Sequence, residues 1–141
     1  MSLNPLIPAL ASILVLGGSI LVPTVAQAEV YELRTYTTNE GKLDNLNARF
    51  RDHTCKLFEK HGLTNVGYWV PLDEKDNRLV YVISSPNRAA HGKAWKAFLN
   101  DPDWKKAFAA STAKGRLVAK IDSTFLSATD YSPAVKPAKA K

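Results

Sequence analysis

The sequence predicts an α+β fold of the ferredoxin-like type, with the element order βαββαβ and a four-stranded antiparallel sheet. Three observations support this fold class. Apolar and polar residues alternate directly after residue 28 and again near the C-terminal end of the chain. An amphipathic helical segment follows the first alternating stretch and leads into an aromatic hairpin. A second helical region follows the hairpin and is divided by Asp101-Pro102.

The first strand and the first helix are predicted over residues 29–37 and 42–61. In the strand, alternate residues share a face, with Tyr31, Leu33 and Thr35 on one side and Glu32, Arg34 and Tyr36 on the other. In the helix, side chains of the buried stripe recur at helical spacing, at Leu43, Leu46, Phe50, Leu57 and His61. Gly62 follows at the position where a glycine usually ends a helix.

The second half of the predicted fold begins with a hairpin of strands 64–70 and 78–84. Ser85-Pro86 predicts the start of a helix that runs through Leu99, because a capping residue followed by proline is typical of a helix N-terminus. Asp101-Pro102 repeats this signal for a helix over 103–114, which Gly115 ends. Alternation over 118–128 predicts the last strand.

A sheet with helices on one face leaves its other face to water or to another molecule. We expect Leu33 to face the helices, and Arg34 and Tyr36 to lie on the uncovered face. A second copy of the chain laid on that face would close a dimeric α/β barrel. The sequence therefore predicts a homodimer.

The first 28 residues predict a signal peptide. They contain no charged side chain, and an apolar run ends before the small-residue pattern Ala26-Gln27-Ala28. The run is shorter than the roughly 20 residues that span a bilayer. We therefore expect cleavage between Ala28 and Glu29, export to the periplasm or the medium, and no stable membrane span in the mature chain.

The mature chain is predicted to be one domain, residues 29–131, followed by a disordered Pro/Ala/Lys tail, residues 132–141. The chain has a formal net charge of +6, and about half of it belongs to the three tail lysines. The remaining charge is too small to predict a nucleic-acid partner. Cys55 is the only cysteine, so no intramolecular disulfide can form, and its helical position predicts an exposed thiol.

Arg34, Tyr36, Trp69 and Tyr81 are candidate ligand-binding residues. Arg34 could hold an anionic group and Tyr36 could donate a hydrogen bond, or Arg34 could instead pair with Glu32 or Asp122. Trp69 and Tyr81 could form an apolar pocket for a flat ligand, or they could belong to the core.

His53 is the fifth candidate, because it lies at the edge of the apolar stripe of the first helix. It could serve as a lone axial ligand of haem, or be a half-buried, hydrogen-bonded histidine. The spacing of the histidines and the single cysteine predicts no metal site, and we expect no cofactor.

Several short motifs together resemble the NIPSNAP domain from about Tyr31 to Pro133. They are Glu32 to Tyr36, Gly41-Lys42, Phe50 to Thr54, Leu57 to Gly62, Gly67 to Trp69, Asn77, Tyr81-Val82, Arg88, Trp95, Phe98 and Asp101 to Trp104. The resemblance implies a dimeric α/β barrel, akin to the small monooxygenases of antibiotic biosynthesis. It implies no established activity.

Two functions follow as hypotheses. The first is an exported homodimeric module that binds a small hydrophobic or aromatic ligand or serves in assembly. The second is an oxygenase or isomerase of the dimeric α/β-barrel type, either cofactor-independent or haem-dependent, using Arg34, Tyr36 and His53. The sequence itself contains no nucleophile, phosphate-loop or dinucleotide motif that would favour another enzyme class.

Overall fold

The computed structural model describes residues 29–72 and 77–135. The expected signal peptide, residues 1–28, lies outside the described residues, as do 136–141 of the expected tail. The described residues follow the predicted order βαββαβ, with the first helix in three consecutive parts and the second in two. The predicted α+β fold is therefore confirmed.

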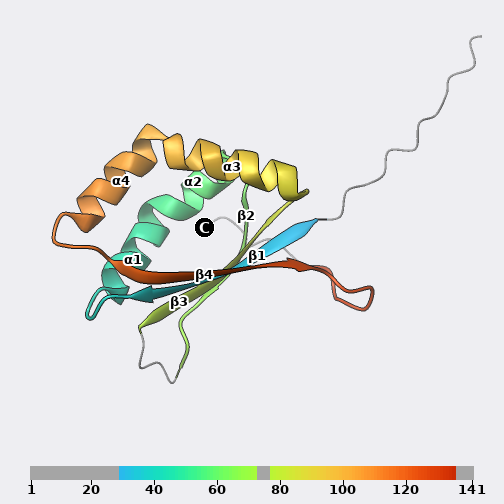
Figure 1. The fold of residues 1–141 in the computed structure, drawn as a ribbon, viewed down its shortest axis with the longest axis horizontal. Helices are drawn as coiled ribbons and strands as arrows, with labels where there is room; N and C mark the ends of the chain where they lie inside the picture. Colours follow the sequence, from blue (N-terminus) through green and yellow to red (C-terminus); the bar gives the residue numbers. More distant parts are fainter. Residues whose placement is uncertain (1–28, 73–76, 136–141) are drawn as a thin grey trace, which may run out of the picture.

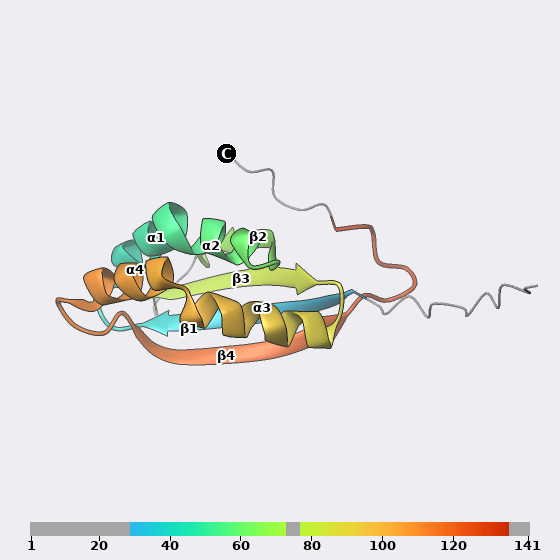
Figure 2. The ribbon, with the colours of Figure 1, turned by 90° about the horizontal axis from the view of Figure 1, so that it is seen from above.

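Four antiparallel strands form one sheet in the order β2-β3-β1-β4 (Figure 1). The strands are β1 (Val30–Thr38), β2 (Thr64–Trp69), β3 (Arg78–Ser85) and β4 (Val118–Ser127). Each lies within one residue of its predicted bounds. All helices cover the same face of this sheet (Figures 1 and 2).

The first helical stretch is continuous but not uniform. It consists of α1 (Leu43–Arg49), the π-helical segment η1 (Phe50–Thr54) and α2 (Cys55–Lys60). A π turn takes up one residue more than an α turn, and such turns often lie at functional sites. Gly62 follows with φ +88°, a left-handed conformation that glycine adopts without strain, and it ends the helix as predicted.

Two further helices, α3 (Arg88–Asn100) and α4 (Pro102–Thr112), meet at Asp101. Asp101 caps α4 as predicted, accepting a hydrogen bond from the Asp103 N–H at 2.7 Å. The predicted start of α3 is wrong by two residues, because Ser85 still belongs to β3. The side chain of Asn87 caps α3 instead, by accepting a hydrogen bond from the Ala90 N–H.

The expected orientation of β1 is also wrong. Glu32 and Tyr36 are buried on the side of the helices together with Arg34, whereas Leu33 points to the uncovered face. Alternation establishes which residues share a face, but not which face the helices cover. Here α3 supplies polar partners for Glu32, so the charged face of β1 can be the buried one.

Aromatic rings dominate the core between the sheet and the helices. Tyr81 and Phe58 are fully buried, and Phe50 packs against both of them and against Tyr36. Within the described parts of the chain, no helix has the length and apolar character needed to cross a membrane.

Candidate functional site

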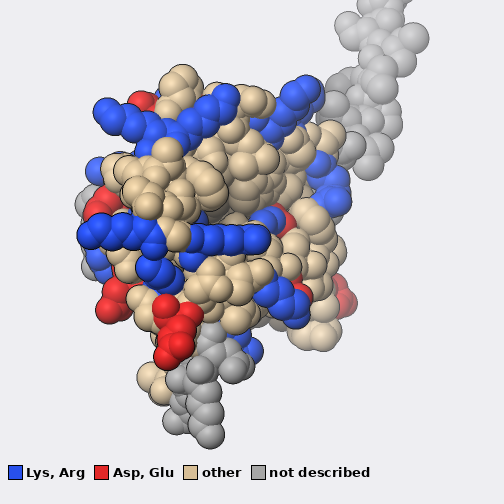
Figure 3. Space-filling view, turned by 60° about the vertical axis from the view of Figure 1, so that its left-hand side comes forward, with Lys and Arg blue, Asp and Glu red and all other residues tan. Residues whose placement is uncertain are grey.

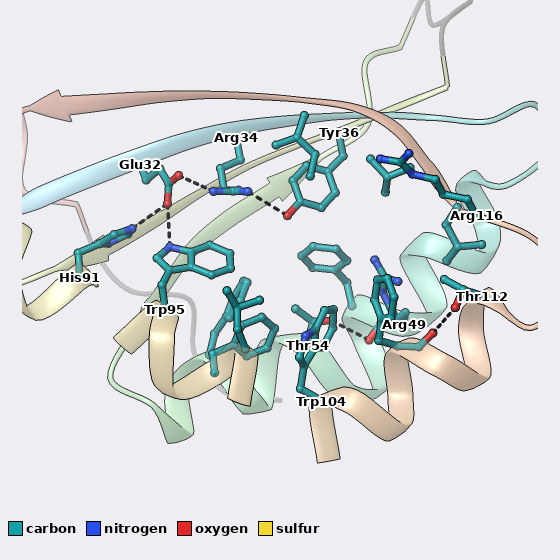
Figure 4. A pocket seen from close by; sticks show the side chains of 18 of the residues that line it. Glu32, Arg34, Tyr36, Arg49, Thr54, His91, Trp95, Trp104, Thr112 and Arg116 are labelled. Atoms are coloured by element: carbon teal, nitrogen blue, oxygen red, sulfur yellow. Dashed lines mark hydrogen bonds and ion pairs between the residues drawn. The ribbon is translucent and has the colours of Figure 1, made fainter. Parts of the chain in front are cut away.

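A cavity of about 510 Å³ lies between the sheet and the helices, on the side of β1 and β4. This volume is in the range of small-molecule sites. Its walls are mostly aromatic and aliphatic, with Phe50, Phe58, Trp95, Phe98, Leu99, Trp104, Phe108, Leu117, Val118, Ile121 and Phe125. The polar side chains in its lining are Glu32, Arg34, Tyr36, Arg49, Thr54, His91, Thr112 and Arg116 (Figure 4).

Glu32 is the centre of a buried hydrogen-bond network on one wall of the cavity. Its Oε1 accepts from Arg34 Nη1 and from Ser123 Oγ, both at 2.5 Å. Its Oε2 lies 2.8 Å from His91 Nε2 and accepts from Trp95 Nε1 at 3.0 Å. Donors from two strands and one helix therefore hold the carboxylate, which fixes α3 against the sheet.

This network keeps Glu32 ionised. Burial alone would raise its pKa, but the hydrogen bonds from His91 and Ser123 and the positive charge of Arg34 outweigh burial. Together they lower the pKa of Glu32 from 4.5 to about 2.

The lowered pKa of Glu32 predicts a loss of stability in acid. In the unfolded chain Glu32 takes up a proton near pH 4.5, whereas in the folded chain it does so near pH 2, so its stabilisation is complete above pH 4.5 and falls away towards pH 2. We expect the advantage of the wild type over Glu32→Gln to shrink by about 2 kcal/mol between pH 6 and pH 3. Urea unfolding of both proteins at the two pH values measures this, and a constant difference would contradict it.

Arg34 and Tyr36 lie side by side on β1 and both project into the cavity (Figure 4). Arg34 Nη2 donates to the Tyr36 hydroxyl at 3.3 Å, and its guanidinium lies 4.5 Å from the centre of the Trp95 ring. The sequence left Glu32 and Asp122 as possible ion-pair partners of Arg34, and in the structure Arg34 pairs with Glu32. Asp122 pairs instead with Lys120. The charge of Arg34 is thus neutralised within the wall.

Arg49, at the end of α1, is a cavity residue that sequence reasoning missed. Its side chain is 5% exposed. Its Nη1 donates to Ser111 Oγ at 3.2 Å, its Nε has no hydrogen-bond partner, and no described carboxylate forms an ion pair with it. Trp104 and Phe108 pack around the guanidinium at 5.2 and 5.3 Å from their ring centres. Burial lowers the pKa of Arg49, although an arginine remains protonated.

A signal for Arg49 does exist in the sequence. Arg49 lies three residues after Leu46 and directly before Phe50, and this spacing places a charged side chain on the apolar stripe of the helix. His91 and Trp95 are two further cavity residues that were not predicted, although the sequence contains a signal for them as well. Their spacing of four places both on one face of α3, so that both reach Glu32.

Three of the five predicted site residues lie away from this cavity. Tyr81 is fully buried in the core, where it stacks on Tyr68 with ring centres 5.3 Å apart. Trp69 is 54% exposed and shares the uncovered face of the sheet with Val80, its partner in register. His53 is exposed, because the π turn brings its neighbour Thr54 into the wall instead. The structure thus brings together only Arg34 and Tyr36.

The expectation of an exposed Cys55 is also wrong. Cys55 is half-buried and packs against the core, and burial raises the pKa of its thiol. A raised pKa keeps the sulfur protonated and less reactive at neutral pH.

The histidines do not suit an axial haem ligand. His91, the histidine in the cavity wall, uses both ring nitrogens, Nε2 towards Glu32 and Nδ1 towards Ser85 Oγ at 3.0 Å. His61 Nε2 lies 2.6 Å from a carboxylate oxygen of Asp101, and His53 does not line the cavity. Among residues 29–72 and 77–135, no group of His, Cys, Asp or Glu is placed to hold a metal ion.

Comparisons with known proteins agree on family and fold. The sequence profile of the NIPSNAP family matches residues 31–133. No curated protein matches the sequence significantly. A NIPSNAP-like domain protein from Burkholderia xenovorans is similar in structure, with TM-score 0.68, 14% identity, and coverage of 79% of this chain and 94% of that one.

Two further solved structures share the fold. A NIPSNAP family protein of unknown function from Agrobacterium tumefaciens has TM-score 0.66 and 18% identity, covering 76% of this chain and 94% of that one. SnoaB, a cofactor-independent oxygenase from Streptomyces nogalater, has TM-score 0.56 and 19% identity, covering 76% of this chain and 99% of that one. Identities this low establish a common fold and nothing about shared chemistry.

Proposed function

Because the chain belongs to the NIPSNAP family, we propose that it is a small-molecule-binding module whose ligand lies in the cavity between the sheet and the helices. One observation carries this proposal. The cavity of about 510 Å³ has aromatic and aliphatic walls with a few fixed polar groups, which is the usual composition of a ligand site. A flat, mostly apolar molecule matches these walls, since aromatic rings stack or meet edge to face.

We also propose that the functional unit is a homodimer formed through the uncovered face of the sheet. Leu33, Val80 and Val82 are only partly buried there, and Trp69 and Leu126 are 54% and 42% exposed. Exposed apolar side chains of this size favour a protein partner over water. A second copy offers a complementary face by two-fold symmetry.

We also propose that the protein is exported, with cleavage before Glu29. β1 begins at Val30, two residues after the expected cleavage site, so cleavage would leave the strand intact. Native mass spectrometry of the protein from its own source tests the whole proposal in one measurement. We expect a chain that starts at Glu29, a dimer, and a retained small molecule; a full-length, ligand-free monomer would contradict all three.

Narrowing the cavity should abolish binding. Leu99 lines the cavity but is 52% exposed, so Leu99→Trp can fill space without disturbing the core. We expect the affinity for 2-naphthamide, a neutral planar probe, to fall at least about tenfold, because an indole occupies the space that the probe needs. Isothermal titration calorimetry measures this affinity.

The matched control is Leu72→Trp, since Leu72 is fully exposed and does not line the cavity. It adds the same indole, and its affinity should equal that of the wild type. Equal weakening by both variants would refute the cavity as the binding site.

A cofactor-independent oxygenase is the second candidate. It is favoured by the Tyr36 hydroxyl, which Arg34 holds inside the apolar cavity, and by the fold shared with SnoaB. An oxygen electrode separates the two candidates, because an oxygenase consumes O₂ with its bound substrate whereas a binding module does not. The arrangement of the histidines gives no support to a haem-dependent version.

A further inference from the structure

We infer that the ligand of this cavity is an anion, a small aromatic or apolar carboxylate whose charged end binds Arg49. This inference rests on the proposed function and adds to it the class of ligand. It starts from a difference between Arg34, which is partly buried, and Arg49, which is buried. Arg34 has its counter-charge in Glu32, whereas Arg49 has none among the described residues.

A buried guanidinium without a counter-charge is unfavourable, because the protein interior replaces its hydration poorly. Arg49 Nη1 donates a hydrogen bond to Ser111 Oγ. The neighbouring rings of Trp104 and Phe108 present only their π faces to the guanidinium. Arg49 Nε has no partner, although it is buried in a side chain that lines the cavity. A carboxylate in the cavity would supply both the missing acceptor and the missing charge.

The surroundings of Arg49 fit the rest of such a molecule. Trp104 packs on Arg49, and Phe50 and Leu117 also line the cavity, so apolar side chains are available to enclose a body attached to the carboxylate. Across the cavity, the acidic side chain Glu32 is already engaged by four donors and so does not compete for Arg49.

Arg116 also lines the cavity. Figure 3, which brings forward the end where α4 passes into β4, shows Lys and Arg side chains spread over this face, with acidic side chains mainly at its lower left and right edges. Approach of an anion is favoured at such a surface.

The test compares two probes of nearly equal shape, 2-naphthoate and the neutral 2-naphthamide. We expect the wild-type protein to bind the carboxylate roughly ten- to a hundredfold more tightly, the range that a charge-assisted hydrogen bond gives. Arg49→Met should remove this preference by weakening 2-naphthoate alone. Arg49→Lys should keep part of it, because the charge remains while the planar fork is lost. Calorimetry at pH 7 measures the affinities, and circular dichroism verifies that each variant is folded.

Arg51→Met is the matched control, because Arg51 is two residues away but exposed and outside the cavity. It should leave the preference for the carboxylate unchanged. Equal affinities of the wild type for the two probes would overturn the anion site and leave the cavity function standing. A preference that survives in both folded Arg49 variants would overturn it as well. Binding of neither probe would overturn the proposed function itself, and the anion site with it.

Discussion

Replacing Glu32 by alanine is expected to destabilise the domain by about 3 to 5 kcal/mol, the cost of breaking a buried ion pair by removing one partner. The variant would leave the guanidinium of Arg34 without its counter-charge in the cavity wall. It would also remove the acceptor of Trp95 Nε1 and the partner of His91 Nε2, two groups that join α3 to the sheet. Urea unfolding at pH 7, followed by circular dichroism, measures the effect.

Asp103→Ala is the control for this substitution. Asp103 is also a carboxylate, but its side chain is 75% exposed on α4, away from the proposed dimer face, and pairs with an exposed lysine, Lys60. Exposed pairs of this kind contribute about 0 to 1 kcal/mol. Similar losses in the two variants would show that the network around Glu32 does not hold the helices to the sheet.

Replacing Leu33 by glutamate is expected to convert the proposed dimer into a folded monomer. Leu33 lies on central strand β1 and points to the uncovered face, opposite Val82 in register. In a dimer through this face, two carboxylates would become buried without partners, which should weaken self-association by at least about 100-fold. In the monomer they would meet water, so the fold should survive. Sedimentation velocity over a range of concentrations measures the change.

Ala97→Glu serves as the comparison, because Ala97 is exposed on α3, on the opposite side of the molecule from that face. It introduces the same charge and should leave the dimer intact. A wild-type protein that sediments as a monomer would refute the dimer. So would a Leu33→Glu protein that associates as tightly as the wild type.

Local signals in the sequence were enough to predict the fold. Gly62 and Asp101-Pro102 act through the chain next to them, since one permits a left-handed turn and the other caps and starts a helix. Strand bounds were predictable for the same reason, because alternation is a property of neighbouring residues. The start of α3 was not, because Ser85 pairs with Val30 of β1, far away in the sequence.

The candidate site was predicted only in part, because its burial depends on contacts between distant elements. Arg34 and Tyr36 both line the cavity, but their face was predicted to lie on the outside, since charge normally avoids a core. Only the folded chain brings His91 to Glu32, and that contact makes the charged face the buried one. Arg49 was overlooked because a cation on an apolar stripe has no local partner that would mark it.

The π-helical segment η1 has a consequence for the charge of the cavity wall. Four buried residues follow one another at intervals of four, namely Leu46, Phe50, Thr54 and Phe58, with exposures of 0, 5, 1 and 1%. In a uniform α-helix each interval rotates the side chain by about 40°, so the series would turn by about 120°. One additional residue in a wider turn compensates for most of that rotation.

The same change in rotation determines which of two neighbouring residues, His53 or Thr54, faces the interior. Uniform α-helical spacing would place His53, seven residues after Leu46, within about 20° of it. The π turn instead directs the imidazole to solvent and the Thr54 hydroxyl inwards, where it donates to the Arg49 carbonyl oxygen at 3.3 Å. Of the ionisable side chains of α1, η1 and α2, only Arg49 lines the cavity. The charge that these helices contribute to the cavity wall therefore stays constant across the pH range in which an imidazole would gain or lose a proton.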